Sequence, residues 1–191
     1  MGDARHRSDG ELVERFRSGE REAFATLYQT HFPAVFRFAF YMTGDRLRAG
    51  EITQDVFVWL VHHPGEFDAE RGDLGAFLTG VARKYVHRLQ RTERRWLPLD
   101  DAVTSSRGSY GTEFAGTLER DQEAAELRKA IAALPARYRE AVVLCDLQEA
   151  SYEQAAAILG CATGTVRSRL HRARELLARK VTHIKEGLRC L

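Results

Sequence analysis

Cysteine is scarce in this chain, and the few cysteines present do not pair by spacing. The 191 residues contain three, Cys145, Cys161 and Cys190, and no two of them form a C-x-x-C motif. An odd number without such a motif argues against a disulfide framework and against a zinc knuckle. Because unpaired cysteine is commonly a small buried residue, we expect Cys145 and Cys161 to lie in the core and Cys190 to be an exposed tail thiol. This usage is typical of a reducing cytoplasm.

Long apolar runs and a recognisable leader are also missing. The first ten residues, MGDARHRSDG, are polar. No apolar stretch approaches the length of about 20 residues that a membrane-spanning helix needs. We therefore expect a soluble, cytoplasmic protein without membrane insertion.

The chain lacks the motifs of common catalytic and cofactor sites. It has no glycine-rich phosphate loop, no recognisable pairing of a nucleophile with a base, and no internal repeat. The adjacent residues His62 and His63 could ligate a metal, but such a pair without further ligands is more typical of an ordinary loop. We therefore expect neither an enzyme nor a bound cofactor or metal.

Charge is plentiful but almost balanced, so the formal net charge of +2 by itself predicts little. Its distribution is more informative, because two stretches far apart in sequence are basic. The first, 83–95, has Glu93 as its one acidic residue against six arginines and lysines, and 164–181 has a similar excess. Two basic patches indicate two contacts with nucleic acid.

The segment 151–180 has the pattern of two helices joined by a sharp turn. Ser151 and Gln154 form a capping box that predicts a helix start at Tyr152. Gly160 supplies the left-handed residue that ends a helix. We expect Thr163 or Thr165 to cap the second helix, whose apolar residues recur at helical spacing. Small inner residues, a turn glycine and this stripe predict a helix-turn-helix; the stripe comprises Val166, Leu170, Ala173 and Leu177.

The side of the second helix opposite this stripe is basic. The helix that follows such a turn presents its N-terminal residues to the DNA major groove, where arginine can bond base edges or phosphates. The alternative is a solvated face on a surface helix, which the turn chemistry makes less favoured. The residues concerned are Arg167, Ser168, His171 and Arg172, flanked by Arg169 and Arg174.

Further helices are predicted upstream. Ser8 and Glu11 form a second capping box, which predicts a helix start. Apolar residues also recur at helical spacing over about 47–61 and 73–95. An aromatic-rich run over 24–41 predicts a helix that packs in a core, through Phe24, Leu27, Tyr28, Phe32, Val35, Phe36, Ala39 and Tyr41.

A change in composition divides the chain. Residues 96–116 are rich in Ser, Gly and Asp, which is typical of a flexible linker. Helical patterning resumes near Thr117, stops at Pro135 and then restarts. The predicted fold class is therefore all-α, with two small helical domains, 1–95 and 117–191, joined by the linker.

Three segments together carry a resemblance to a known family. They are GEITQDVFVWL, FDAERGDLGAFLTGVARKYVHRL and LPARYREAVVLCDLQEASYEQAAAILGCATGTVRSRLHRAREL. In order and spacing they resemble bacterial extracytoplasmic-function (ECF, group IV) sigma factors, the promoter-specificity subunits of RNA polymerase. A lone helix-turn-helix would be far less specific, and this resemblance covers nearly the whole chain.

The resemblance implies that residues 1–95 are sigma domain 2, which docks on the clamp helices of core RNA polymerase and opens the minus-ten promoter element. It implies polymerase contacts at Glu51, Gln54 and Asp55. The loop from His62 to Asp68 matches the family's loop that captures a flipped base. The implied minus-ten contacts are His62, His63, Phe67, Asp68, Lys84, His87, Arg88 and Arg91.

Residues 117–191 are implied to be sigma domain 4, which binds the polymerase flap and reads the minus-thirty-five element. The family also implies an anti-sigma factor as a partner, and a linker that passes near the polymerase active-site channel. The implied minus-thirty-five contacts are Thr165, Arg167, Ser168, Arg169, His171, Arg172 and Arg174, and the outermost, Arg167, Ser168 and His171, are expected to specify sequence.

Some positions depart from the family pattern. Lys84 and Arg88 stand where many members have Asn and Asp, so the upstream minus-ten contacts differ here; Phe77 replaces a frequent Trp. The main alternative is a free-standing helix-turn-helix regulator whose N-terminal domain senses a ligand or dimerises, and which binds a palindromic operator without polymerase. An enzyme with an appended DNA-binding domain has no supporting motif.

Overall fold

The structure is a computed structural model that describes residues 2–96 and 118–188, with side chains for 9–93 and 124–180. Within these ranges the chain forms helices and no strand, which confirms the all-α prediction. It divides into two compact units, the first formed by the first four α-helices and the second by the last four, with Tyr41–Arg46 grouping with the second. Most of the predicted linker, and Cys190, lie outside the described residues.

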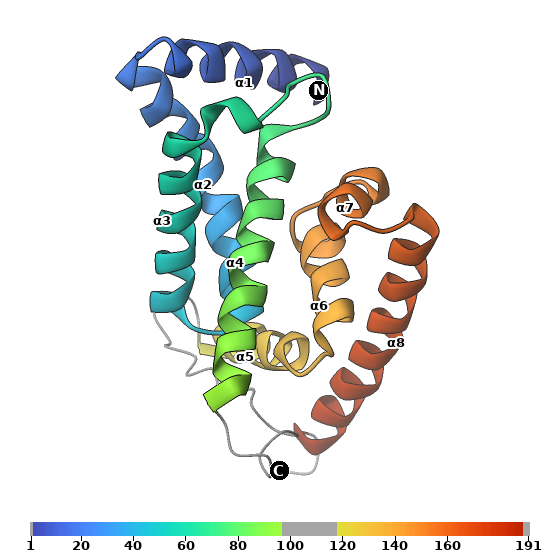
Figure 1. The fold of residues 1–191 in the computed structure, drawn as a ribbon. Coiled ribbons are helices and arrows are strands. Elements are labelled where there is room, and N and C mark those ends of the chain that lie inside the picture. Colours follow the sequence, from blue (N-terminus) through green and yellow to red (C-terminus); the bar gives the residue numbers. More distant parts are fainter. Residues whose placement is uncertain (1, 97–117, 189–191) are drawn as a thin grey trace. The chain divides into compact units, whose positions relative to one another are not determined.

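Unit 1 contains four helices and one short 3-10 turn. They are α1 (Gly2–Arg17), α2 (Arg21–Thr43), α3 (Arg46–His62), η1 (Pro64–Glu66) and α4 (Leu74–Trp96). In Figure 1, α2, α3 and α4 run side by side and α1 crosses one end of them, where it lies against the loop that contains η1. The observed bounds of α3 and α4 agree with the predicted helices to within one residue.

The core of unit 1 is mainly aliphatic. Leu27, Val35, Leu60 and Leu78 are fully buried, and the one aromatic on α2 that is fully buried among the described side chains is Phe38. Phe38 was not among the predicted core residues. Four of the predicted aromatics instead contact one another along one edge of α2 at four-residue spacing: Phe24, Phe32 and Phe36 are half-buried, and Tyr28 is exposed.

The N-terminal capping box predicted at Ser8 and Glu11 is wrong. The first helix already begins at Gly2, so Ser8 lies inside α1. Tertiary contacts hold α1 in place: Val13 is buried, and the buried carboxylate of Asp9 lies 3.2 Å from Nε2 of His31 on α2. A capping motif in sequence does not start a helix when the residues before it are also drawn into helical conformation.

Unit 2 contains α5 (Leu118–Ala132), α6 (Ala136–Val142), a π-helical turn η3 (Val143–Leu147), α7 (Tyr152–Leu159) and α8 (Thr163–Leu188). The break predicted at Pro135 is confirmed, since this proline precedes α6 and its carbonyl accepts hydrogen bonds from the N–H groups of Tyr138 and Arg139 at 2.9 and 3.0 Å. Buried residues of α5, α6, η3, α7 and α8 all contribute to the core of this unit. In the described part of the chain, no helix has the length and apolar character required to cross a membrane.

Candidate nucleic-acid interface

The turn between α7 and α8 has the geometry that the sequence predicts. The capping box is present: Ser151 N–H donates to Oε1 of Gln154 at 2.9 Å, and Gln154 N–H donates to Oγ of Ser151 at 3.1 Å. Gly160 has φ 64° and ψ 42°, in the left-handed region that lets the chain leave α7 sharply. Its N–H and that of Cys161 both donate to the carbonyl of Ala156. These bonds fix the start of α7 and the turn into α8.

The start of α8 differs from the prediction in detail. The helix begins at Thr163, and the carbonyl of Ala162 accepts hydrogen bonds from the N–H groups of Thr165 and Val166 at 2.9 and 3.2 Å. Thr165 therefore lies inside the first turn and does not cap it, and Thr163 is already helical. The apolar stripe is confirmed at Val166, Leu170 and Ala173, which are buried, whereas Leu177 is half-buried.

The outer face of α8 presents several of the predicted DNA contacts to solvent. Arg167, Ser168, His171 and Arg172 are exposed, while Thr165 and Arg169 are half-buried. The Arg167 guanidinium carbon lies 5.8 Å from the ring centre of Tyr152, the first residue of α7. Ser168 Oγ donates to the Thr165 carbonyl at 3.0 Å, so in this conformation its proton faces the helix.

Glu175 holds two of these cationic side chains. Its carboxylate accepts a hydrogen bond from Nη1 of Arg172 at 2.6 Å and lies 3.4 Å from Nε2 of His171. The hydrogen bond from Arg172 is the main reason that the pKa of Glu175 is lowered. A negative charge beside the basic face opposes the approach of DNA phosphates.

Arg174 is placed differently from the expectation. It is exposed, but its guanidinium forms a two-point bond with Asp146 in η3, with Nη2–Oδ1 and Nε–Oδ2 distances of 2.6 and 3.2 Å. This contact ties α8 to the turn before α7. A DNA contact by Arg174 therefore stays a prediction that requires this pair to open.

In unit 1, cationic residues follow one another along α4. Lys84, Arg88 and Arg91 are exposed and spaced at four and three residues, so they share one face of the helix. His87 is half-buried. The structure therefore brings the predicted upstream minus-ten residues together as a basic ridge.

In the loop that contains η1, three of the four residues expected to contact DNA are exposed and one is buried. His62, His63 and Asp68 are exposed, and the ring of His63 stacks on Trp59 with 4.8 Å between centres. Phe67 is 4 % exposed and packs against Phe77 at 5.6 Å between ring centres. Its side chain is therefore part of the core beneath the loop and does not face solvent, in contrast to the expected DNA contact.

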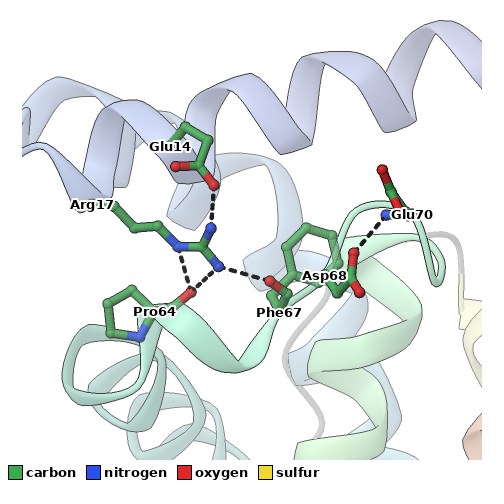
Figure 2. Close-up of polar contacts among 6 residues, drawn as sticks. All are labelled: Glu14, Arg17, Pro64, Phe67, Asp68 and Glu70. Carbon is green, nitrogen blue, oxygen red and sulfur yellow. Dashed lines mark hydrogen bonds and ion pairs between the residues drawn. The ribbon is translucent and has the colours of Figure 1, made fainter.

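The backbone of this loop is held by Arg17, the last residue of α1. Figure 2 shows its guanidinium between Glu14 and two loop carbonyls. Nε and Nη2 donate to the Pro64 carbonyl at 2.9 and 2.7 Å, and Nη2 also donates to the Phe67 carbonyl at 2.7 Å. Glu14 pairs with Nη1. Arg17 has no signal in the sequence, because its partners are backbone atoms 47 and 50 residues away along the chain.

The residues expected to contact polymerase share one exposed face of α3. Glu51, Gln54 and Asp55 are exposed, whereas Ile52 and Val56 on the opposite side are buried. Leu47 and Val58 lie on the same outer side at 80 % and 47 % exposure. This face is therefore acidic at its centre and apolar at its ends.

The cysteines are less buried than expected. Cys145 and Cys161 are free and half-buried, so neither is a fully packed core residue. Burial raises the pKa of the Cys145 thiol, with nearby Asp146 adding to the effect. Among the side chains that the structure describes, no cluster of three His, Cys, Asp or Glu residues is placed to hold a metal.

Comparison with known proteins agrees with this organisation. The sigma-70 region 2 family model matches residues 27–96, and the sigma-70 region 4 family model matches residues 124–177. The ECF sigma-E factor of Escherichia coli is 32% identical over 190 residues, which cover 91% of this chain and 94% of that protein. SigE of Mycolicibacterium smegmatis is 33% identical over 157 residues, which cover 79% of this chain. The chain spans 58% and 64% of the length of SigE and of Streptomyces coelicolor BldN.

A solved structure has the same fold. The sigma factor RpoE from Bartonella quintana, solved in complex with the anti-sigma factor NepR, matches with a TM-score of 0.71 and 29% identity, covering 83% of this chain and 96% of that one. Two helical units with these family matches define a protein of the sigma-70 class. The chain belongs to the sigma-70 family of RNA polymerase sigma factors.

Proposed function

We propose that the protein is a sigma factor of the ECF group that binds core RNA polymerase and directs it to specific promoters. The observation that carries the proposal is the pairing, in one chain, of a region 4 helix-turn-helix with an exposed basic face and a region 2 unit with its own basic ridge. Two separate basic surfaces suit two separate promoter elements. The proposed domains are 1–95, the linker 96–116, and 117–191.

Unit 2 reads the minus-thirty-five element through α8. Arginine can bond guanine edges in the major groove, and contacts to phosphates add affinity without sequence choice. The exposed residues Arg167, Ser168 and His171 are the candidates for recognising the base sequence. Arg172 binds DNA phosphates after its hydrogen bond with Glu175 breaks. Thr165, Arg169 and Arg174 are supporting contacts.

Unit 1 opens the minus-ten element without ATP. Lys84, Arg88 and Arg91 bind phosphates at its upstream edge, where His87 also lies. The loop 62–68 receives a base that leaves the stack, which offsets the unstacking cost of a few kcal/mol. Of the predicted contacts in this loop, His62, His63 and Asp68 are exposed; His63 also stacks on Trp59, and Asp68 Oδ1 accepts a hydrogen bond from the N–H of Glu70 at 2.9 Å. Phe67 supports the loop from the core.

The exposed face of α3 docks on the clamp helices of core polymerase. Glu51, Gln54 and Asp55 offer carboxylates and an amide to basic groups, and Val58 adds apolar area. Unit 2 contacts the flap. The protein therefore has no catalytic role and supplies promoter specificity to an enzyme that performs the chemistry.

An anti-sigma factor is the expected regulator, acting in the cytoplasm. This part of the proposal is supported by the related RpoE of Bartonella quintana, which was solved in complex with the anti-sigma factor NepR. Such a partner restrains a sigma factor if it covers the surfaces used for polymerase and promoter.

The test mixes the purified protein with bacterial core RNA polymerase, asks by gel filtration whether the two co-elute, and then maps run-off transcripts on genomic DNA. Co-elution with new initiation sites is the expected result. No association with core polymerase, together with tight binding of the protein alone to a palindromic DNA site, would overturn the proposal in favour of a free-standing regulator.

A further inference from the structure

The loop proposed to capture the flipped base is held in shape from two directions. From below, Phe67 inserts its ring into the core of unit 1 against Phe77. From the side, the Arg17 guanidinium donates to the carbonyls of Pro64 and Phe67 (Figure 2). These two carbonyls lie at the start of η1 and immediately after its end. The Arg17 side chain therefore binds the backbone at both ends of η1.

The rest of α1 reinforces this contact. A Cβ added at Gly10 would lie 3.0 Å from Cβ of Ala69. The close approach of α1 to the loop at Ala69 therefore depends on glycine having no side chain. Asp9, the preceding residue, is buried, and its carboxylate lies 3.2 Å from Nε2 of His31, which adds a contact between α1 and α2. Glu14 pairs with Nη1 of Arg17 and so orients the planar guanidinium.

We infer that Arg17 is a positioning residue for promoter opening, which fixes the backbone of the base-capturing loop before DNA binds. The inference rests on the proposed function. Backbone carbonyls at both ends of η1 are tied, while His62, His63 and Asp68 stay exposed for the base. A loop that is already ordered loses less conformational entropy when it captures a base, so opening is favoured. Lysine cannot replace this arginine, because the bonds need a planar fork with several donors.

The experiment uses the holoenzyme on a promoter identified by its own run-off transcripts. Arg17→Ala and Arg17→Lys are compared with Arg15→Ala, a matched control, since Arg15 lies in the same last turn of α1 but pairs with Glu20 outside the loop. The readouts are core-polymerase binding, thermal unfolding, permanganate reactivity of promoter thymines, and initiation on a template whose minus-ten region is already mismatched. Hydrogen exchange of the peptide 62–70 reports loop order.

Both Arg17 variants are expected to bind core polymerase normally. Their opening of duplex promoter, measured as permanganate reactivity, should fall about tenfold because charge-assisted hydrogen bonds to the loop are lost. The mismatched template should restore most initiation, and exchange in the loop should rise, while Arg15→Ala behaves as the wild type. Normal opening in Arg17→Ala overturns the inference. So does a joint loss of stability and core binding in both variants, which indicates a merely structural role. A wild-type protein that does not bind core polymerase overturns the proposed function itself.

Discussion

Single side chains on α8 are engaged by neighbours before any DNA is present. Arg172 and His171 face Glu175, Arg174 is bonded to Asp146, and Arg167 lies over Tyr152. Exposed ion pairs of this kind contribute little to folding stability, since solvent screens them. Their larger effect is on binding, because each pair must be exchanged for a contact with DNA. The basic face is therefore weaker than its arginine count suggests.

Replacing Glu175 with glutamine tests this competition. Glu175→Gln removes the negative charge beside Arg172 and His171, and we expect affinity for generic duplex DNA at low salt to rise about threefold, as for an exposed charge pair. Fluorescence anisotropy with a labelled duplex over a salt series measures the change. Glu126→Gln, which breaks a similar exposed pair with Lys129 on α5, is the control and should change affinity less. Equal effects of the two variants would show that Glu175 does not restrain the face.

At the scale of the element, the turn between α7 and α8 is determined locally. The capping box at Ser151 and the left-handed Gly160 were both predictable, because they depend on residues within a few positions of each other. The start of α1 and the fully buried Phe38 were not, since they depend on packing between helices distant in sequence. Local chemistry predicts an element well where the chain supplies its own hydrogen bonds.

Gly160 offers a clean test of the turn. A Cβ there would meet no atom within 4 Å, so the cost of Gly160→Ala is backbone strain alone. We expect the free energy of unfolding to fall by about 1 kcal/mol, the penalty for a left-handed alanine. Gly164→Ala, equally uncrowded but inside α8 without positive φ, should be neutral or slightly stabilising. Urea denaturation followed by circular dichroism measures both, and an unchanged Gly160→Ala would contradict the turn's role.

At the scale of the whole molecule, the proposed work is divided between the two units. The acidic face of α3 and the basic ridge of α4 belong to unit 1, while the basic face of α8 belongs to unit 2. Substitutions that alter one surface without touching either core should therefore separate polymerase binding from promoter reading.

Reversing charge on α3 should abolish one function only. Glu51→Lys with Asp55→Lys places cations where the clamp helices of polymerase are expected to be basic, and we expect affinity for core polymerase to fall about tenfold or more. Affinity of the free protein for duplex DNA should not fall. Glu11→Lys with Glu22→Lys reverses the same number of exposed charges on α1 and α2 and is the control. Unchanged co-elution of the α3 variant with core polymerase would show that the clamp assignment is wrong.

Truncating the outer face of α8 should have the opposite effect. Arg167→Ala with His171→Ala removes two side chains proposed to reach the major groove, so we expect initiation at promoters with a minus-thirty-five element to fall about tenfold. Binding to core polymerase should remain. The control, Lys129→Ala with Arg137→Ala, removes two exposed cations elsewhere in unit 2. Footprinting measures binding to the promoter, and gel filtration measures binding to core polymerase. Loss of polymerase binding would count against the assignment of Arg167 and His171 to the minus-thirty-five element.

The sequence alone determined the all-α class, the bounds of α3 and α4, and the helix-turn-helix, because helical periodicity, capping residues and a turn glycine act over a few positions. It also identified the exposed cations of α8. The tertiary structure decided which predicted contacts are free: Phe67 is in the core and Arg174 is bonded to Asp146. It alone revealed that Arg17 binds the backbone of the loop, since a guanidinium that binds distant backbone carbonyls leaves no pattern in the sequence.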